Sequence, residues 1–120
     1  ITKKMQPETE IKYFKFLPTL YGTKNLIFLG DFNCPETHSV FNPLKKLGNK
    51  SALQSQKTTL RQKCLKGDCL ASEFDNFFYK SEKIKLIKAE AIHFYKKYPE
   101  LKLARKLSDH IPIIMTFELL

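Results

Sequence analysis

Apolar and polar positions along the chain change between the spacing of helices and that of extended strands. After Pro7, apolar residues recur at helical spacing as Ile11, Phe14 and Leu17, and acidic residues occupy the first turn. This pattern predicts a helix with one buried stripe, whose end is marked by Pro18 and Gly22.

The rest of the pattern alternates further strands with short helices. Strands are expected over residues 25–29, 51–54, 73–79, 83–87 and 111–117, and helical pieces over residues 37–47 and 98–104. Gly48 would end the first of these helical pieces, and Pro43 would interrupt it. Mixed elements of this kind indicate an α/β fold.

The composition is that of one globular domain. The chain has 120 residues, 42% of them hydrophobic, with 10 Phe and 5 Tyr. A chain of this length can bury a core, and none of its apolar runs approaches the roughly 18 residues that a membrane span needs. We therefore expect residues 1–120 to form a single domain without a membrane span.

The charge balance is strongly basic. There are 21 Lys and Arg residues against 12 Asp and Glu, a formal net charge of +9, and only Arg61 and Arg105 are arginines. Lysine-rich surfaces favour phosphate-rich partners without reading a base sequence, which points to nucleic acid. A solvated lysine surface that only keeps the protein soluble accounts for the same charge equally well.

Three cysteines are too few for a disulfide scaffold. Cys64 and Cys69 could close a short loop by a disulfide, and their spacing without nearby histidines is a poor zinc pattern, so a plain loop with two thiols is expected. The chain opens with Ile1, so its native start is expected to lie further upstream. The cellular compartment stays open between cytoplasm and secretion.

Three of the four aspartates, Asp31, Asp75 and Asp109, lie beside predicted strands. In the stretch from Gly30 to Asn33, continued strand geometry would direct Asp31 and Asn33 to one side and Phe32 into the packing. Strand ends gather distant side chains into one site, and these carboxylates would suit Mg²⁺, Mn²⁺ or Ca²⁺. Such a site can perform phosphoryl-transfer chemistry.

Three motifs in this order resemble the last three motifs of the endonuclease/exonuclease/phosphatase superfamily, which has the deoxyribonuclease I-like fold. They are Gly-Asp-Phe-Asn at 30–33, Phe-Asp-Asn at 74–76 and Ser-Asp-His-Ile-Pro-Ile at 108–113. The resemblance implies that the chain is the C-terminal half of a two-sheet α/β sandwich. It also implies a metal-dependent phosphodiester hydrolase, with DNA as the favoured substrate.

The resemblance also implies roles for the motif residues. Asp31 and Asn33 would position the attacking water and the scissile phosphate. Asp109 would help to hold the metal ion, and His110 would act as general base or stabilise the pentavalent transition state.

The same resemblance gives Asp75 the task of orienting a second histidine and makes Asn76, like Asn33, a substrate contact. That second histidine and the glutamate that dominates metal binding come earlier in the family's sequence than this chain begins. Neither Glu8 nor Glu10 replaces the glutamate, because both belong to the first turn of the predicted helix. We therefore expect the isolated chain to have little nuclease activity and weak metal affinity.

Two other functions are compatible with the sequence. The chain could belong to a phosphomonoesterase or phospholipid hydrolase of the same superfamily, or it could be a non-catalytic basic module that binds nucleic acid or supports assembly. The other histidines have simpler interpretations: His38 as a surface or capping residue, and His93 as a partly buried residue at a strand edge.

A half-fold would leave apolar sheet surface in water. Residues 26–29 and 111–115 are nearly continuous apolar runs, as in strands that are buried on both faces. Exposed apolar patches beyond several hundred Å² are rare on monomers, so we expect a two-fold homodimer or aggregation.

Overall fold

The computed structural model describes residues 1–120, with the side chain of Met5 left aside. It is a mixed α/β structure with seven strands in three small antiparallel sheets. The helical elements are η1 (Lys3–Met5), α1 (Pro7–Glu10), η2 (Ile11–Phe16), α2 (Leu17–Tyr21), η3 (Ser39–Phe41), α3 (Asn42–Lys46), η4 (Phe94–Lys97) and α4 (Leu101–Leu107). The strands are β1 (Ile27–Asp31), β2 (Asn49–Ser51), β3 (Leu60–Leu65), β4 (Asp68–Leu70), β5 (Asp75–Lys80), β6 (Ile84–Ala91) and β7 (Ile113–Leu119).

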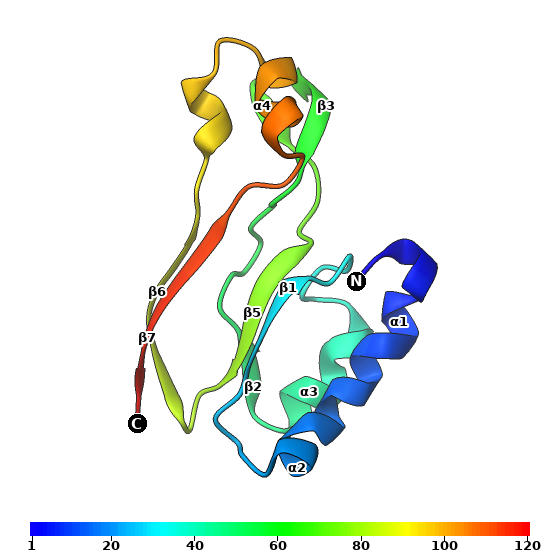
Figure 1. Ribbon diagram of the computed structural model, residues 1–120, viewed down its shortest axis with the longest axis vertical. Helices are drawn as coiled ribbons and strands as arrows, with labels where there is room; N and C mark the ends of the chain where they lie inside the picture. Colours follow the sequence, from blue (N-terminus) through cyan, green and yellow to red (C-terminus); the bar gives the residue numbers. More distant parts are fainter.

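A three-stranded sheet in the order β1-β5-β2 forms the centre of the lower half of the molecule (Figure 1). The helical segment from α1 to α2 and the α3 helix cover one face of this sheet. Between them lies a core of buried side chains that includes Ile11, Phe32, Phe41 and Phe78. The rings of Phe41 and Phe78 stack at 4.5 Å between centroids, so aromatic packing joins the sheet to its helical cover.

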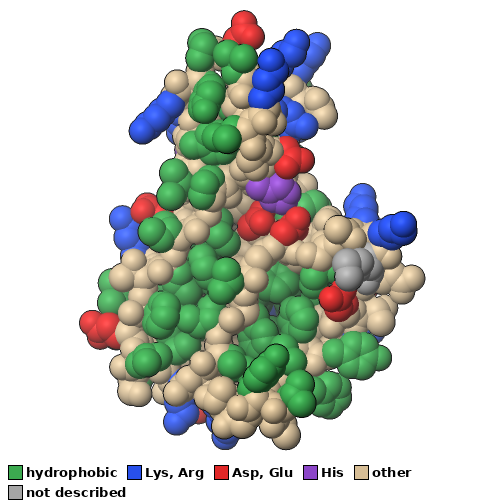
Figure 2. All heavy atoms as spheres, in the orientation of Figure 1, with side chains coloured by type: hydrophobic (Ala, Val, Ile, Leu, Met, Phe, Trp, Pro, Cys, Tyr) green, Lys and Arg blue, Asp and Glu red, His purple; other side chains and the backbone are tan. Residues whose placement is uncertain are grey.

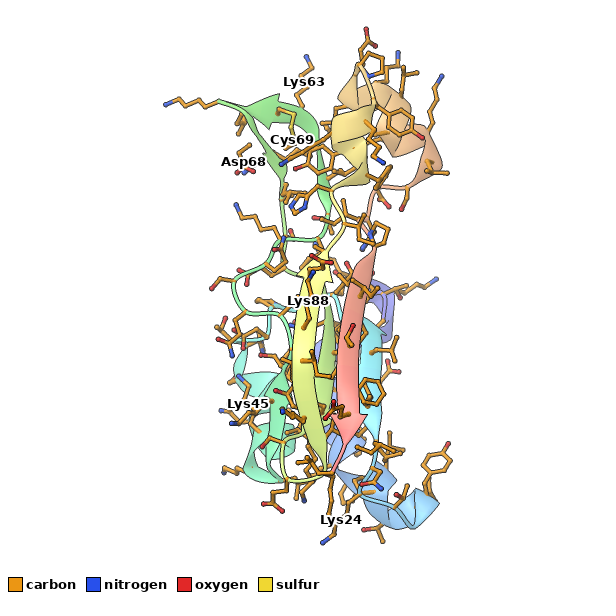
Figure 3. All side chains as sticks on the ribbon, turned by 90° about the vertical axis from the view of Figure 1, so that its left-hand side faces the viewer. Lys24, Lys45, Lys63, Asp68, Cys69 and Lys88 are labelled. Atoms are coloured by element: carbon orange, nitrogen blue, oxygen red, sulfur yellow. A yellow bond between two sulfur atoms is a disulfide. The ribbon has the colours of Figure 1, made fainter. Side chains whose placement is uncertain are left out.

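The β6–β7 hairpin lies over the opposite face of the sheet, in front of β5 in Figure 3. Side chains alternate along β5, so Phe78 points to the helices while Phe77 and Tyr79 point the other way, and all three are buried. β5 is therefore covered on both faces, as its continuous apolar run from Phe77 to Tyr79 requires.

A second, smaller core forms the upper end of the molecule, where the β3–β4 hairpin packs with α4 and η4 (Figure 1). Its buried residues are Leu60, Leu70, Ala91, Ala104 and Ile111. With one core above the other the molecule is elongated, 47 × 32 × 22 Å along its principal axes.

The expectation of a plain loop around Cys64 and Cys69 is wrong. The two cysteines form a disulfide across the β3–β4 hairpin, whose turn contains Gly67 at φ +83°. Asp68 accepts a hydrogen bond from the backbone N–H of Leu70 at 3.1 Å, which supports the turn. The alternation of polar and apolar residues is weak along this exposed hairpin, and the disulfide and turn replace a buried face as its support.

Most other predicted elements are confirmed with shifted bounds. The N-terminal helical segment spans residues 7–21, with Ile11 fully buried. The strand expected over residues 51–54 lies at Asn49–Ser51. Pro18 lies within α2 instead of marking the end of the helical segment, and Pro43 lies in the first turn of α3 instead of interrupting a helix. In the part of the chain that the structure describes, no helix has the length and apolar character needed to cross a membrane.

Candidate active site

The candidate site lies where the two cores meet. Asp31 ends β1 and Asp75 begins β5, and the antiparallel register places these two residues opposite each other. The segment before β7, which carries Asp109 and His110, is fixed by two backbone hydrogen bonds: Leu60 N–H to the carbonyl of Asp109 at 2.7 Å, and Ile111 N–H to the carbonyl of Thr58 at 2.8 Å. Backbone pairing thus brings the ends of three sequence motifs together.

The imidazole of His110 is the centre of the group. Its Nδ1 lies 2.7 Å from Oδ2 of Asp75, and its Nε2 lies 3.6 Å from Oδ2 of Asp31 and 4.0 Å from Oδ1 of Asp109. Figure 2 shows a histidine bordered by acidic side chains at the middle of one face of the molecule, with Lys and Arg side chains towards the upper end.

The pairing of Asp75 differs from the expectation. The resemblance assigned Asp75 to a second histidine, whereas in the structure Asp75 holds His110 itself. A carboxylate accepts hydrogen bonds, so this contact places the proton on Nδ1 and leaves Nε2 facing Asp31. Asp75 therefore selects the ring orientation and the proton position of His110.

Thr58, which the sequence reasoning missed, fixes Asp75 in turn. The Thr58 side chain is fully buried, and its hydroxyl donates to Oδ2 of Asp75 at 2.5 Å. The same hydroxyl oxygen accepts from the backbone N–H of Asp75 at 3.0 Å and of Phe74 at 3.3 Å. Asp75, Thr58 and His110 thus form a chain of hydrogen bonds. The local sequence Lys57-Thr58-Thr59 does not predict this role of Thr58, because the role depends on a contact with Asp75, 17 residues further along the chain.

The surroundings of His110 change its pKa in two opposing directions. Partial burial, the largest single effect, lowers the pKa of His110, but the hydrogen bond and charge of Asp75 and the charges of Asp31 and Asp109 together raise it above its usual value of 6.5. The imidazole is therefore held in the protonated, hydrogen-bond-donating form over a wider pH range than a free histidine.

The turn from Gly30 to Asn33 positions Asp31. Gly30 has φ +140°, a conformation that other residues rarely adopt, and Asn33 has φ +52°. The backbone N–H of Asn33 donates to Oδ1 of Asp31 at 2.9 Å, and Phe32 is buried against Phe41 and Phe78. Phe32 thus points into the packing as predicted, but β1 ends at Asp31 and the turn, instead of strand alternation, places Asn33.

Asn76 is not positioned as a substrate contact would be. It is buried, its Nδ2 donates to the carbonyl of Leu53 at 2.8 Å, and its Oδ1 accepts from the backbone N–H of Leu53 at 3.0 Å and of Phe77 at 2.8 Å. Both ends of the amide are used within the protein. Asn76 therefore holds the segment after β2 against β5, beside the site.

The carboxylates around His110 include potential ligands for a divalent cation. Asp31, Asp75 and His110 each offer an atom within 4.8 Å of the others. Oδ2 of Asp75 already accepts from Thr58 and His110, so the oxygens of Asp31 and of the exposed Asp109 are the better donors for a hard cation. Two carboxylates fit a cation that completes its shell with water and substrate oxygens.

A second group, Glu8, Cys34 and His38, also brings three potential ligand atoms within 4.8 Å. Nδ1 of His38 accepts the backbone N–H of Val40 at 3.0 Å and caps η3, as the sequence suggested. Burial, followed by the charge of Glu8, raises the pKa of the Cys34 thiol, so this sulfur stays protonated and is a poor metal ligand.

Comparison with protein-family models, with curated proteins and with solved structures finds no match to this chain. The resemblance to the endonuclease/exonuclease/phosphatase superfamily therefore rests on the three short sequence motifs alone.

Proposed function

We propose that the chain forms part of the catalytic site of a metal-dependent phosphodiester hydrolase that acts on nucleic acid, with DNA as the first substrate to test. One observation carries the proposal. Asp31, Asp75 and the Asp109–His110 pair come from three motifs far apart in the sequence, and all three meet around a single imidazole.

Each side chain has a role that follows from its contacts. Asp31 and Asp109 would hold a divalent cation, which when bound neutralises the negative charge of a phosphodiester. Asp75, held by Thr58, keeps the Nδ1 proton of His110 in place. Nε2 of His110 then faces Asp31, and beside this carboxylate a protonated imidazole can donate a hydrogen bond to a phosphoryl oxygen and stabilise the charge of the transition state. The raised pKa of His110 favours this role over that of general base.

The choice of nucleic acid rests on charge. The site itself is acidic, but the chain has a formal net charge of +9 that attracts polyanions from a distance. Because almost all the basic residues are lysines, the attraction should be sensitive to salt and indifferent to sequence.

Nicking of supercoiled plasmid with Mg²⁺ or Mn²⁺ tests the proposal, since one cut per molecule is visible. We expect slow nicking that EDTA stops and that His110→Ala reduces at least ~100-fold, the usual scale for loss of a hydrogen-bond donor that stabilises the transition state. His93→Ala is the matched control, because His93 lies at the start of η4 outside the site, and it should nick like the wild type.

Nicking that resists EDTA or survives His110→Ala would reject the site. DNA binding without any nicking, together with no Mn²⁺ broadening of the His110 ring signals in the NMR spectrum, would instead favour a non-catalytic binding module. Release of phosphate from a monoester or a phospholipid, without plasmid nicking, would reassign the substrate within the same chemistry.

A further inference from the structure

An apolar groove adjoins the candidate site and has no role in the proposed hydrolysis. It has a volume of about 510 Å³ and lies between η4 with Tyr98 on one side and the end of α4 with the segment before β7 on the other. Its walls include Phe94, Lys97, Tyr98, Leu107, His110 and Pro112. Figure 2 shows hydrophobic side chains above the histidine on the same face of the molecule.

The walls of the groove suit a flat aromatic ring. The rings of Phe94 and Tyr98 stand at 88° to each other, 6.0 Å apart, so an inserted ring can lie flat on one and meet the edge of the other. Leu107, which lines the groove, is 70% exposed, so a ligand in the groove would cover apolar surface.

The position of His110 links this groove to the reaction. His110 lines the groove and its Nε2 faces Asp31, so a ligand in the groove lies next to the candidate site. Lys97, which also lines the groove, offers a cation to a phosphate beside it. Apolar walls, an adjacent cation and a phosphate-handling site together match the parts of one nucleotide.

We propose that this groove binds the base of a nucleotide next to the phosphate that is cleaved, and that the protein therefore prefers single-stranded or unpaired nucleic acid. The inference rests on the proposed function. A paired base is stacked within its duplex and cannot enter the groove without being extruded, which costs binding energy. An unpaired base enters freely and gains the stacking that single-strand binding proteins use.

Two oligonucleotides of equal length and charge test the proposal, one with bases and a 2-aminopurine at its centre, the other with abasic sugars throughout. Binding is measured in EDTA, so that no turnover occurs, by the anisotropy of a terminal dye. We expect the base-bearing strand to bind roughly tenfold tighter than the abasic strand, the scale of base–aromatic stacking, and its 2-aminopurine fluorescence to be quenched. The matching duplex should bind more weakly than the single strand.

Variants of one groove residue separate stacking from folding. Tyr98→Ala should remove most of the preference for bases, whereas Tyr98→Phe, which keeps a ring, should retain it. Tyr21→Ala, which removes an exposed tyrosine of α2 outside the groove, should behave like the wild type. Equal affinity for the two strands, or equal behaviour of Tyr98→Ala and Tyr21→Ala, would overturn the proposal.

The remaining outcomes separate this inference from the proposed function. Base-dependent binding without plasmid nicking would keep the groove and reject the hydrolase. Nicking without a preference for bases would keep the hydrolase and reject the groove, and failure to bind either strand would reject both. Binding to phosphatidylserine vesicles that Tyr98→Ala abolishes, without discrimination between the two strands, would assign the groove to lipid and overturn the nucleotide proposal.

Discussion

Replacing Thr58 by valine tests whether the hydrogen bonds behind His110 organise the site. Valine has nearly the shape of threonine, so Thr58→Val removes a buried hydroxyl with little change in packing. Asp75 loses a donor at 2.5 Å, and two backbone N–H groups, those of Phe74 and Asp75, lose their acceptor. The backbone hydrogen bonds of Thr58 itself, to Ser72 and Ile111, can remain.

The expected cost of Thr58→Val follows from these contacts. A hydrogen bond to a charged group contributes about 1.5–3 kcal/mol, and backbone groups left without a partner add to the loss. The Asp75 side chain is only 14% exposed, so water compensates little. We expect a loss of about 3 kcal/mol in the free energy of unfolding, a large part of the roughly 6–18 kcal/mol of a domain of this size. The midpoint of thermal unfolding should fall by about 10 °C.

Urea and thermal unfolding followed by circular dichroism measure this change. Thr116→Val is the control, because Thr116 is an exposed residue of β7 where valine suits a strand. Thr58→Ser, which keeps the hydroxyl, should be less destabilising than Thr58→Val. If Thr58→Val is no more destabilising than Thr116→Val, the hydroxyl does not hold Asp75 and the account of the site is wrong.

Three further predictions concern other parts of the molecule. Carboxylates raise the pKa of His110, so its charge stabilises the fold fully below the unfolded pKa of about 6.5, and this stability is lost as pH rises through the higher folded pKa. In EDTA, the urea midpoint of the wild type should therefore fall across that pH window. In His110→Ala this pH-dependent part of the stability should be missing. Reducing the Cys64–Cys69 disulfide should lower the free energy of unfolding by about 2 kcal/mol, the chain-entropy value for so short a loop, and should speed amide hydrogen exchange in the β3–β4 hairpin. Unchanged exchange would contradict this prediction. The exposed apolar side chains of β7 should drive the two-fold dimer or aggregation expected from the sequence. Sedimentation at micromolar concentration should show association that Phe117→Lys weakens and that Leu20→Lys, on α2, leaves unchanged. A clean wild-type monomer would refute this expectation.

Part of the exposed apolar surface lies on strands at sheet edges. Leu29 of β1 is 65% exposed, and Ile114 and Phe117 of β7 are 47% and 41% exposed. β1 is an edge strand of its sheet and β7 has β6 as its only neighbour among the described strands, so both offer free backbone groups as well as apolar side chains. Such edges commonly pair with another chain.

Local sequence patterns determined most of the secondary structure and the identity of the chemical groups. Helical spacing of Ile11, Phe14 and Leu17 predicted the N-terminal helical segment, and apolar runs predicted β1, β5, β6 and β7, because both patterns depend only on residues close in sequence. Gly30, needed at φ +140°, and the buried Phe32 explain why the chain turns just after Asp31.

Only the tertiary structure decided how those groups combine. The sequence could not show that Asp75 holds His110 instead of another histidine, that a buried Thr58 holds Asp75, or that Asn76 is occupied by Leu53, because each contact joins segments 17 to 35 residues apart. The β3–β4 hairpin escaped prediction because its exposed strands lack a regular polar and apolar alternation, and because its packing partner, α4, lies far from it in the sequence. Side-chain chemistry is local, but the neighbours that give it a direction, a proton and a pKa are supplied by the fold.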